Sequence, residues 1–78
     1  MMKVTLYTKD ECGLCREAEE ILRRLGRKIH FDLELVDIER DPELRSRYCD
    51  RVPVVAVEGK EVAAAPLDEA RLRAVLKA

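Results

Sequence analysis

The sequence holds three cysteines, and two of them are spaced for thiol chemistry. Cys12 and Cys15 form a Cys-x-x-Cys pair, whereas Cys49 lies far along the chain. Residues three apart in the first turn of a helix share one face, close enough for a disulfide with Cα atoms about 5.5 Å apart. An odd cysteine count with one tight pair is not a secreted disulfide framework, so the pair indicates redox chemistry or metal binding.

Two secondary-structure elements must position this pair. Residues 3–7 alternate polar and apolar side chains and are rich in β-formers, which predicts a strand. Apolar residues at helical spacing predict a helix over residues 13–25, with Gly26 as its C-cap. The apolar face expected for that helix comprises Leu14, Ala18, Ile21, Leu22 and Leu25. The dithiol is therefore expected where the strand gives way to the helix.

A helix N-terminus gives the two cysteines different chemistry. It presents unpaired backbone N–H groups and a positive dipole end, which favour the thiolate at Cys12. The thiolate is the nucleophile in disulfide exchange. Cys15, inside the helix, is expected to be more buried and less acidic. This asymmetry suits a two-step exchange in which Cys12 attacks a substrate disulfide and Cys15 resolves the mixed disulfide. We therefore expect these two residues to be catalytic.

The rest of the chain predicts three more strands and two more helices. A strand is predicted over residues 30–36, followed by a helix that Asp41 caps and that ends near residue 48 or 49. Residues 54–57 and 61–64 are predicted to form a hairpin around a Glu58-Gly59-Lys60 turn. A last helix is predicted to begin at Pro66 or Leu67. The order βαβαββα requires a parallel first pair with a right-handed crossover. We expect residues 1–78 to form one α/β domain, with three helices flanking a mixed four-stranded sheet.

Beyond the cysteine pair, the chain resembles a known family. The stretch from Tyr7 to Cys15, the Val52-Pro53-Val54 segment and the Gly59 hairpin together look like a glutaredoxin of the thioredoxin superfamily. The chain is especially similar to small glutaredoxin-like bacterial proteins whose domain carries an unknown-function label. In those proteins, too, an Asp-x-x-x-Asp-Pro-Glu-Leu stretch, here residues 37–44, leads into a Tyr and the Val-Pro pair. The resemblance spans essentially the whole chain.

The resemblance implies a thioredoxin fold in which a cis bond precedes Pro53 and the proline loop lies beside the dithiol. In that arrangement the backbone of Val52 pairs with an extended substrate segment. Arg51 either faces the substrate or pairs with Asp50. The substrate-binding residues expected on this basis are Lys9, Gly13, Leu14, Arg51, Val52 and Pro53.

Departures from the glutaredoxin pattern bear on the reductant. Gly13-Leu14 replaces the Pro-Tyr between the cysteines, Arg51 replaces a Thr, and residues 64–66, Ala-Ala-Pro, replace the Gly-Gly that holds the glutathione carboxylate. The candidate glutathione contacts that remain are Lys9, the Val52 backbone and Asp68. We expect no bound cofactor. The reductant is either glutathione, as a co-substrate, or a thioredoxin-reductase-type enzyme, and the substrates are disulfides of proteins or small molecules.

Two other classes of function remain open. One is a metal or iron–sulfur module in which Cys12, Cys15 and Cys49 are ligands across a dimer; the other is a binding adaptor with an idle dithiol. No metal site is expected within a monomer, because His30 is the only histidine and falls away from the dithiol loop. Cys49 is expected to be a small buried residue.

Composition excludes several partners. The chain has 78 residues, 15 basic and 16 acidic, with a formal charge of -1. Neither half is strongly charged, so an electrostatic surface for nucleic acid or membrane is not expected. No apolar run approaches the roughly 20 residues that span a bilayer, and the N-terminus lacks the charged-then-apolar order of a signal peptide, so we expect a cytoplasmic protein. We also expect a monomer. The chain lacks Asn and Gln, which resembles a thermophile composition, although a GC-rich genome gives the same bias.

Overall fold

The structure is a computed structural model that describes residues 2–77. Its elements in chain order are β1 (Lys3–Thr8), α1 (Gly13–Leu25), β2 (Asp32–Asp37), the 3₁₀ turn η1 (Ile38–Arg40), α2 (Pro42–Tyr48), β3 (Val54–Val57), β4 (Lys60–Ala64) and α3 (Glu69–Lys77). This order confirms the predicted βαβαββα arrangement, with η1 as an addition.

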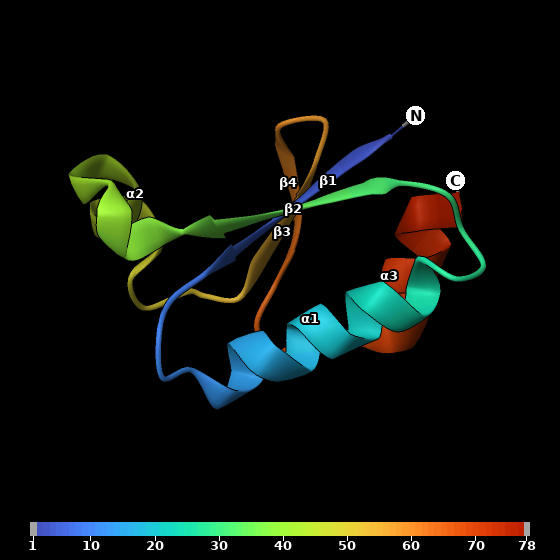
Figure 1. Ribbon diagram of the computed structural model, residues 1–78, viewed down its shortest axis with the longest axis horizontal. Helices are drawn as coiled ribbons and strands as arrows, with labels where there is room; N and C mark the ends of the chain where they lie inside the picture. Colours follow the sequence, from blue (N-terminus) through green and yellow to red (C-terminus); the bar gives the residue numbers. More distant parts are fainter. Residues whose placement is uncertain (1, 78) are drawn as a thin grey trace.

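The four strands form one mixed sheet in the order β2-β1-β3-β4. β1 and β2 are parallel, with Val4 opposite Leu33, whereas β3 is antiparallel to both β1 and β4. The helices α1 and α3 lie together on one side of the sheet, and α2 lies apart from them, beyond the end of β2 (Figure 1). The fold is therefore the mixed four-stranded α/β arrangement that the sequence predicted, and it fits the thioredoxin fold that the resemblance implies.

Two clusters of buried side chains hold the sheet between its helices. Because neighbouring strand residues point to opposite faces, Val55 belongs to one cluster and Val54 to the other. The first cluster joins β1 and β3 to α1 and α3, and its buried members are Val4, Leu6, Ala18, Leu22, Leu25, Val55, Leu72 and Leu76. The second contains Cys15, Ile38, Tyr48, Val52 and Val54. One sulfur of the dithiol is thus part of the core.

The hairpin turn is tighter than predicted. β4 begins at Lys60, so only Glu58 and Gly59 connect the strands, and both have positive φ, at 51° and 81°. Positive φ at both central residues defines the type I′ turn, whose twist matches that of the flanking strands. Gly59 meets this requirement without a steric penalty.

Other features of the elements also differ from the predictions, and β1 and β2 each end one residue later than predicted, at Thr8 and Asp37. β2 begins at Asp32 rather than at His30. α3 begins at Glu69 rather than at residue 66 or 67, because Asp68 caps it, with Oδ1 accepting the Ala70 N–H at 2.9 Å. η1 was not predicted, and the Asp37 carboxylate begins it by accepting the Glu39 N–H at 2.9 Å. At the start of α3 and of η1, an aspartate side chain accepts a hydrogen bond from the backbone N–H two residues later. The periodicity of apolar residues does not predict this kind of interaction.

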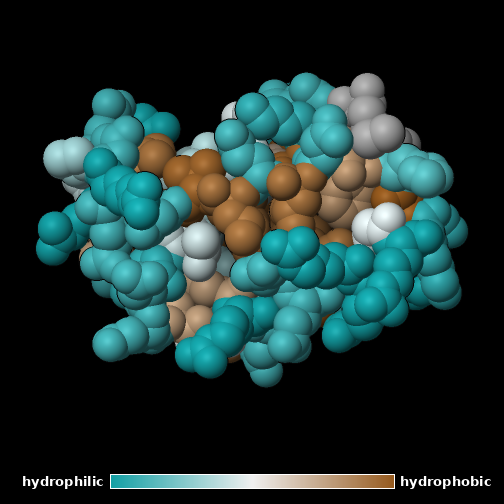
Figure 2. Space-filling model, in the orientation of Figure 1, coloured by the Kyte–Doolittle hydropathy of each residue, from teal (hydrophilic) through white to brown (hydrophobic). Residues whose placement is uncertain are grey.

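The edge strand β2 leaves apolar surface uncovered. Apolar side chains cross the middle of the face seen in Figure 2, where β2 passes in front of the sheet in Figure 1. Leu35 of this strand is 42% exposed.

Within residues 2–77, no helix is both long enough and apolar enough to cross a lipid bilayer.

Candidate functional site

Cys12 is the N-cap of α1, and its sulfur is part of the cap. Its backbone is extended, with φ -118° and ψ 105°, and Sγ accepts the N–H of Cys15 at 3.2 Å. One of the backbone N–H groups that lack a partner at the start of a helix is thereby satisfied by the Cys12 side chain. Cys12 is partly exposed, and all three cysteines carry free thiols. The capping position therefore puts a reachable sulfur at the positive end of a helix.

Cys15 has the opposite environment. It is 3% exposed and packs in the second core cluster with Val52. Burial raises the pKa of the Cys15 thiol, and the hydrogen bond with the Cys12 side chain raises it further. Hydrogen bonds with the Thr8 side chain and the Lys9 backbone act in the other direction. The net direction is upward, so Cys15 keeps its proton at neutral pH.

The loop that delivers the chain to Cys12 contains an unusual backbone angle. Glu11 has φ 54°, in the left-handed region that non-glycine residues rarely adopt. Such a residue costs on the order of 1 kcal/mol and persists only where the surroundings enforce it. The turn from β1 into α1 is thus held in one specific conformation directly before the dithiol.

The Val52-Pro53 segment lies against the dithiol, and its peptide bond is cis. The Val52 N–H donates to the Tyr48 carbonyl at 3.1 Å, which continues the hydrogen-bonding of α2. The expectation that the Val52 backbone pairs with a substrate strand therefore needs correction at its N–H, which already has a partner. The Pro53 carbonyl accepts the Ala65 N–H at 3.0 Å, and this bond ties the segment to a second cis bond, Ala65-Pro66.

Arg51 is held by neighbours within the chain. Its guanidinium forms an ion pair with Glu61 of β4 and lies 5.7 Å from the centre of the Tyr48 ring. The Tyr48 ring stacks on Tyr7 with centroids 4.7 Å apart. Of the two alternatives for Arg51, pairing with Asp50 is wrong, because its ion pair is with Glu61.

Two of the three candidate glutathione contacts also serve the fold. The Lys9 ammonium donates to the Cys49 carbonyl at 3.3 Å, which joins the dithiol loop to the end of α2. Asp68 caps α3. Cys49 itself is exposed, so the expectation that it is buried is wrong; it is the C-cap of the short α2 helix. These cross-links hold the loops around the dithiol in place.

A shallow apolar groove runs beside the dithiol. It has a volume of about 90 Å³ and is lined by Leu14, Glu17, Ala18, Ile21, Pro53, Ala65, Pro66 and Leu67. Leu14, predicted on the buried face of the helix, is instead 54% exposed, whereas its neighbour Cys15 is buried. Gly13 next to it is also exposed, and a Cβ added there would meet no atom within 4 Å.

Sequence reasoning missed most of the groove wall. Ala65, Pro66 and Leu67 reach Leu14 only through the fold. The one sequence feature that pointed to this part of the wall is the Ala-Ala-Pro stretch of residues 64–66, where glutaredoxins carry Gly-Gly. Across residues 2–77, no group of three or more His, Cys, Asp or Glu is arranged to hold a metal ion.

Three comparisons with known proteins agree with this geometry. The model of a family described as "Glutaredoxin-like domain (DUF836)" matches residues 3–77. The uncharacterized protein Rv0508 of Mycobacterium tuberculosis is 35% identical over 77 residues, covering 92% of this chain and 79% of its own length. The solution structure of protein Ne2328 from Nitrosomonas europaea is similar with a TM-score of 0.83 and 36% identity, covering 96% of this chain and 91% of that one.

A more distant likeness shows the fold alone. A single-substitution mutant of the thioredoxin from Halobacterium salinarum is similar with a TM-score of 0.74. It is 22% identical, and the match covers 97% of this chain and 72% of that one. The arrangement of sheet and helices is therefore that of thioredoxins.

Proposed function

Because this chain belongs to the glutaredoxin-like domain family (DUF836), we propose that it is a thiol–disulfide oxidoreductase. Cys12 is the nucleophile and Cys15 the resolving thiol. The observation that carries the proposal is the capping bond: Cys12 Sγ accepts the Cys15 N–H at 3.2 Å from a partly exposed position at the start of α1. The bond places the sulfur that a substrate reaches first at the N-terminus of a helix, and a thiolate is the attacking form in disulfide exchange.

The reaction proceeds by two exchanges of sulfur–sulfur bonds. In the first, the Cys12 thiolate attacks one sulfur of the substrate disulfide; a Cys12–substrate bond forms, the substrate bond breaks, and the leaving sulfur takes a proton. In the second, Cys15 loses its proton and attacks Cys12 Sγ, which forms the intramolecular disulfide and releases the second substrate thiol. Two electrons pass from the dithiol to the substrate.

Substrate docking is proposed for the groove beside Leu14. The groove walls are mainly apolar. Residues of α1 and Pro53 both line the groove. Since the Val52 N–H already donates to Tyr48, the Val52 carbonyl is the backbone group that we propose for an extended substrate segment. The Arg51 guanidinium pairs with Glu61 and lies over Tyr48, which supports a role in positioning this loop.

An external thiol must return the oxidised dithiol to its reduced form. Lys9 and Asp68 hold bonds within the chain, which supports a protein reductant of the thioredoxin-reductase type over glutathione. We propose the cytoplasm as the compartment, because its reducing thiol pool keeps such a dithiol in turnover.

Replacing each cysteine separately tests the proposal. Cys12→Ser should abolish the reduction of a small-molecule disulfide, because no nucleophile remains. Cys15→Ser should instead accumulate one covalent adduct per chain at Cys12, since the mixed disulfide can no longer be resolved. Mass spectrometry of intact protein after exposure to glutathione disulfide, or to an unfolded disulfide-bonded protein, measures the adduct.

Cys49→Ser is the matched control, because Cys49 is exposed but does not cap a helix of the dithiol site. It should keep wild-type turnover. Wild-type protein that reduces neither kind of disulfide, together with no adduct on Cys15→Ser, would sink the proposal. Loss of turnover in Cys49→Ser, together with normal turnover in Cys15→Ser, would show that the resolving thiol is Cys49 and that the proposal is wrong about Cys15.

A further inference from the structure

A second concave site lies at the end of α1 away from the dithiol. A cavity of about 480 Å³ opens between the last turn of α1, the segment that follows it, and α3. Its lining residues are Arg24, Leu25, Arg27, Lys28, Ile29, Glu69, Arg73 and Lys77. Cavities that bind small molecules are commonly about 300–1,000 Å³, so this one has the size for a ligand.

The lining is strongly cationic. Five of its eight residues carry positive charge and one, Glu69, carries negative charge. Glu69 pairs with Arg24 at 2.8 Å, so this carboxylate is already engaged. Within residues 2–77, none of the other four cations takes part in an ion pair. The cavity therefore presents four positive charges that no carboxylate of the described chain neutralises.

The net charge of the sequence does not reveal this cluster of positive charges. Five cations and one carboxylate give the lining a net charge of +4, whereas the whole chain has -1, so the remainder carries -5. Arg27 and Arg73 are far apart in the chain, and only the packing of α3 beside α1 brings them to one cavity (Figure 1). The helix dipole explains a cation at one helix end but not the convergence of two segments on one hollow.

The cavity also has an apolar floor. Leu25 is 4% exposed and belongs to the core beneath, and Ile29 packs against the same cluster. Arginine guanidinium groups match phosphate with two parallel hydrogen bonds, and three arginines line this cavity. Cationic walls above an apolar floor suit a ligand with several phosphate charges and an apolar or planar body.

We propose that this cavity binds a small organic polyphosphate of the nucleotide class. Its phosphates bind to Arg27, Arg73 and the flanking lysines, and its planar body lies on Leu25 and Ile29. An acidic protein segment is the alternative, but a hollow of this volume favours a small molecule over the flat contact that most protein partners make.

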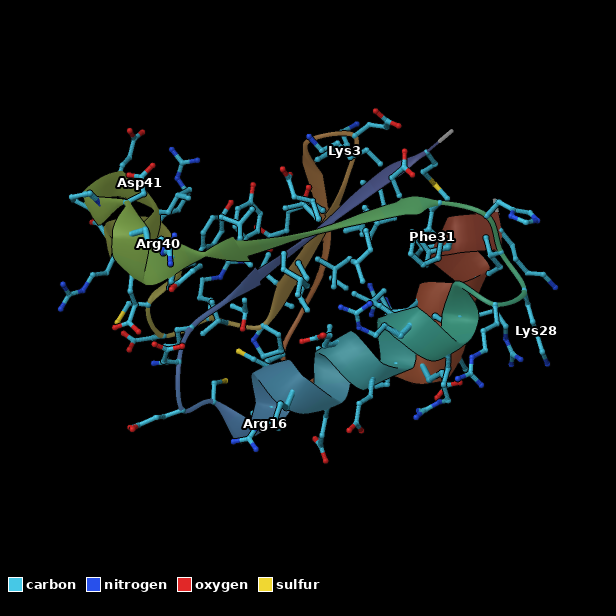
Figure 3. All side chains as sticks on the ribbon, in the orientation of Figure 1. Lys3, Arg16, Lys28, Phe31, Arg40 and Asp41 are labelled. Carbon is cyan, nitrogen blue, oxygen red and sulfur yellow. The ribbon has the colours of Figure 1, made fainter. Side chains whose placement is uncertain are left out.

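The proposed ligand would not cover the dithiol. α1 has 13 residues and is therefore about 20 Å long, with Cys12 at its start and the cavity at its end. Figure 3 shows Lys28 beyond the end of α1 and Arg16 near its beginning. Binding is thus expected to be independent of disulfide exchange and stands whether or not the proposed function holds.

Titration calorimetry of the reduced full chain tests the proposal with three probes: ATP, inorganic pyrophosphate and adenosine. We expect ATP to bind with one site per chain, pyrophosphate to bind more weakly, and adenosine to give no detectable heat. Raising the salt concentration should weaken ATP binding, because exposed charges are screened over about 10 Å at 0.1 M salt.

Arg73→Ala should weaken ATP binding about tenfold, which is typical for the loss of one hydrogen bond to a charged group. The matched control is Arg47→Ala, an exposed arginine of α2 that pairs with Glu43 outside the cavity. It should leave ATP binding unchanged. Circular dichroism and the melting temperature of both variants show whether each is folded.

Three results would overturn the proposal. They are an absence of saturable ATP binding by the folded chain, equal ATP affinity for wild type and folded Arg73→Ala, and binding of a poly-glutamate peptide where ATP gives none. The last result would make the hollow part of a protein-docking surface.

Discussion

One helical turn separates Cys12 from Cys15, and burial makes their chemistry different. Cys12 caps α1 from a partly exposed position, whereas Cys15 is packed into the core beside Val52. Burial raises the pKa of the Cys15 thiol above its ordinary range. Under the proposed function, a resolving thiol that stays protonated until the mixed disulfide forms does not compete with the nucleophile for the substrate.

The raised pKa of Cys15 predicts an alkaline loss of stability. Below the ordinary thiol range, both the folded and the unfolded chain keep the proton, so Cys15 gives no pH dependence. Above that range, the unfolded chain releases the proton while the folded chain keeps it, so the free energy of unfolding falls as pH rises toward the raised pKa. Urea unfolding of the reduced protein at neutral and alkaline pH measures this fall.

Cys15→Ala should show a smaller alkaline fall than wild type, because the buried thiol is gone. Tyrosines and lysines also titrate at high pH, but they contribute to both proteins and cancel in the comparison. Cys49→Ala, which removes an exposed thiol, should behave as wild type. Identical pH slopes for wild type and Cys15→Ala would contradict the argument.

At the level of elements, the sequence predicts what local signals determine. Asp41 and Pro42 mark the start of α2, and Gly26 follows the last residue of α1, so both helices have the predicted bounds. Residues that depend on distant partners were not predictable. Arg51 pairs with Glu61 on another strand, and Lys9 donates to Cys49 forty residues away, so neither contact follows from spacing along the chain.

The loop between α2 and β3 is braced by a row of side chains. The row runs from Tyr7 through Tyr48 and Arg51 to Glu61. If Arg51 acts only by positioning the Val52-Pro53 segment, Arg51→Ala and Glu61→Ala should lower kcat/KM for disulfide reduction by similar factors. The double variant should be no worse than either single one, because the same brace is lost.

Direct contact between Arg51 and substrate makes a different prediction. Glu61→Ala would then free the guanidinium and leave kcat/KM unchanged or raise it, while Arg51→Ala would raise KM. Steady-state kinetics on the three variants therefore separates a positioning residue from a binding residue. Arg51→Lys sharpens the comparison, because it keeps the charge but loses the planar group that lies over Tyr48.

For the whole molecule, the question is what stabilises 78 residues whose dithiol, under the proposed function, forms and loses a disulfide at each turnover. Charged residues make up 40% of the sequence, and the described chain has several ion pairs. Their side chains are largely exposed, however, and exposed pairs typically contribute 0.2–1 kcal/mol each. The two core clusters, one on each face of the sheet, are the stronger source of stability.

The contact between α1 and α3 contains both a buried core side chain and a surface ion pair, so their contributions to stability can be compared there. The Leu72 side chain of α3 is fully buried in the first cluster, and Arg24 of α1 pairs with Glu69 of α3 at the surface. Leu72→Ala should lower the free energy of unfolding by about 2–5 kcal/mol, through lost burial and a cavity. Arg24→Ala should lower it by no more than about 1 kcal/mol.

Urea unfolding of both variants, with the dithiol reduced, measures the two costs. Domains commonly have about 0.05–0.15 kcal/mol of stability per residue, so Leu72→Ala removes a large share of the total for a chain of this length. Leu72→Val, which keeps most of the buried volume, should lie between wild type and Leu72→Ala. An Arg24→Ala cost equal to that of Leu72→Ala would instead make the ion pairs the main support of α3, and stability should then fall steeply with added salt.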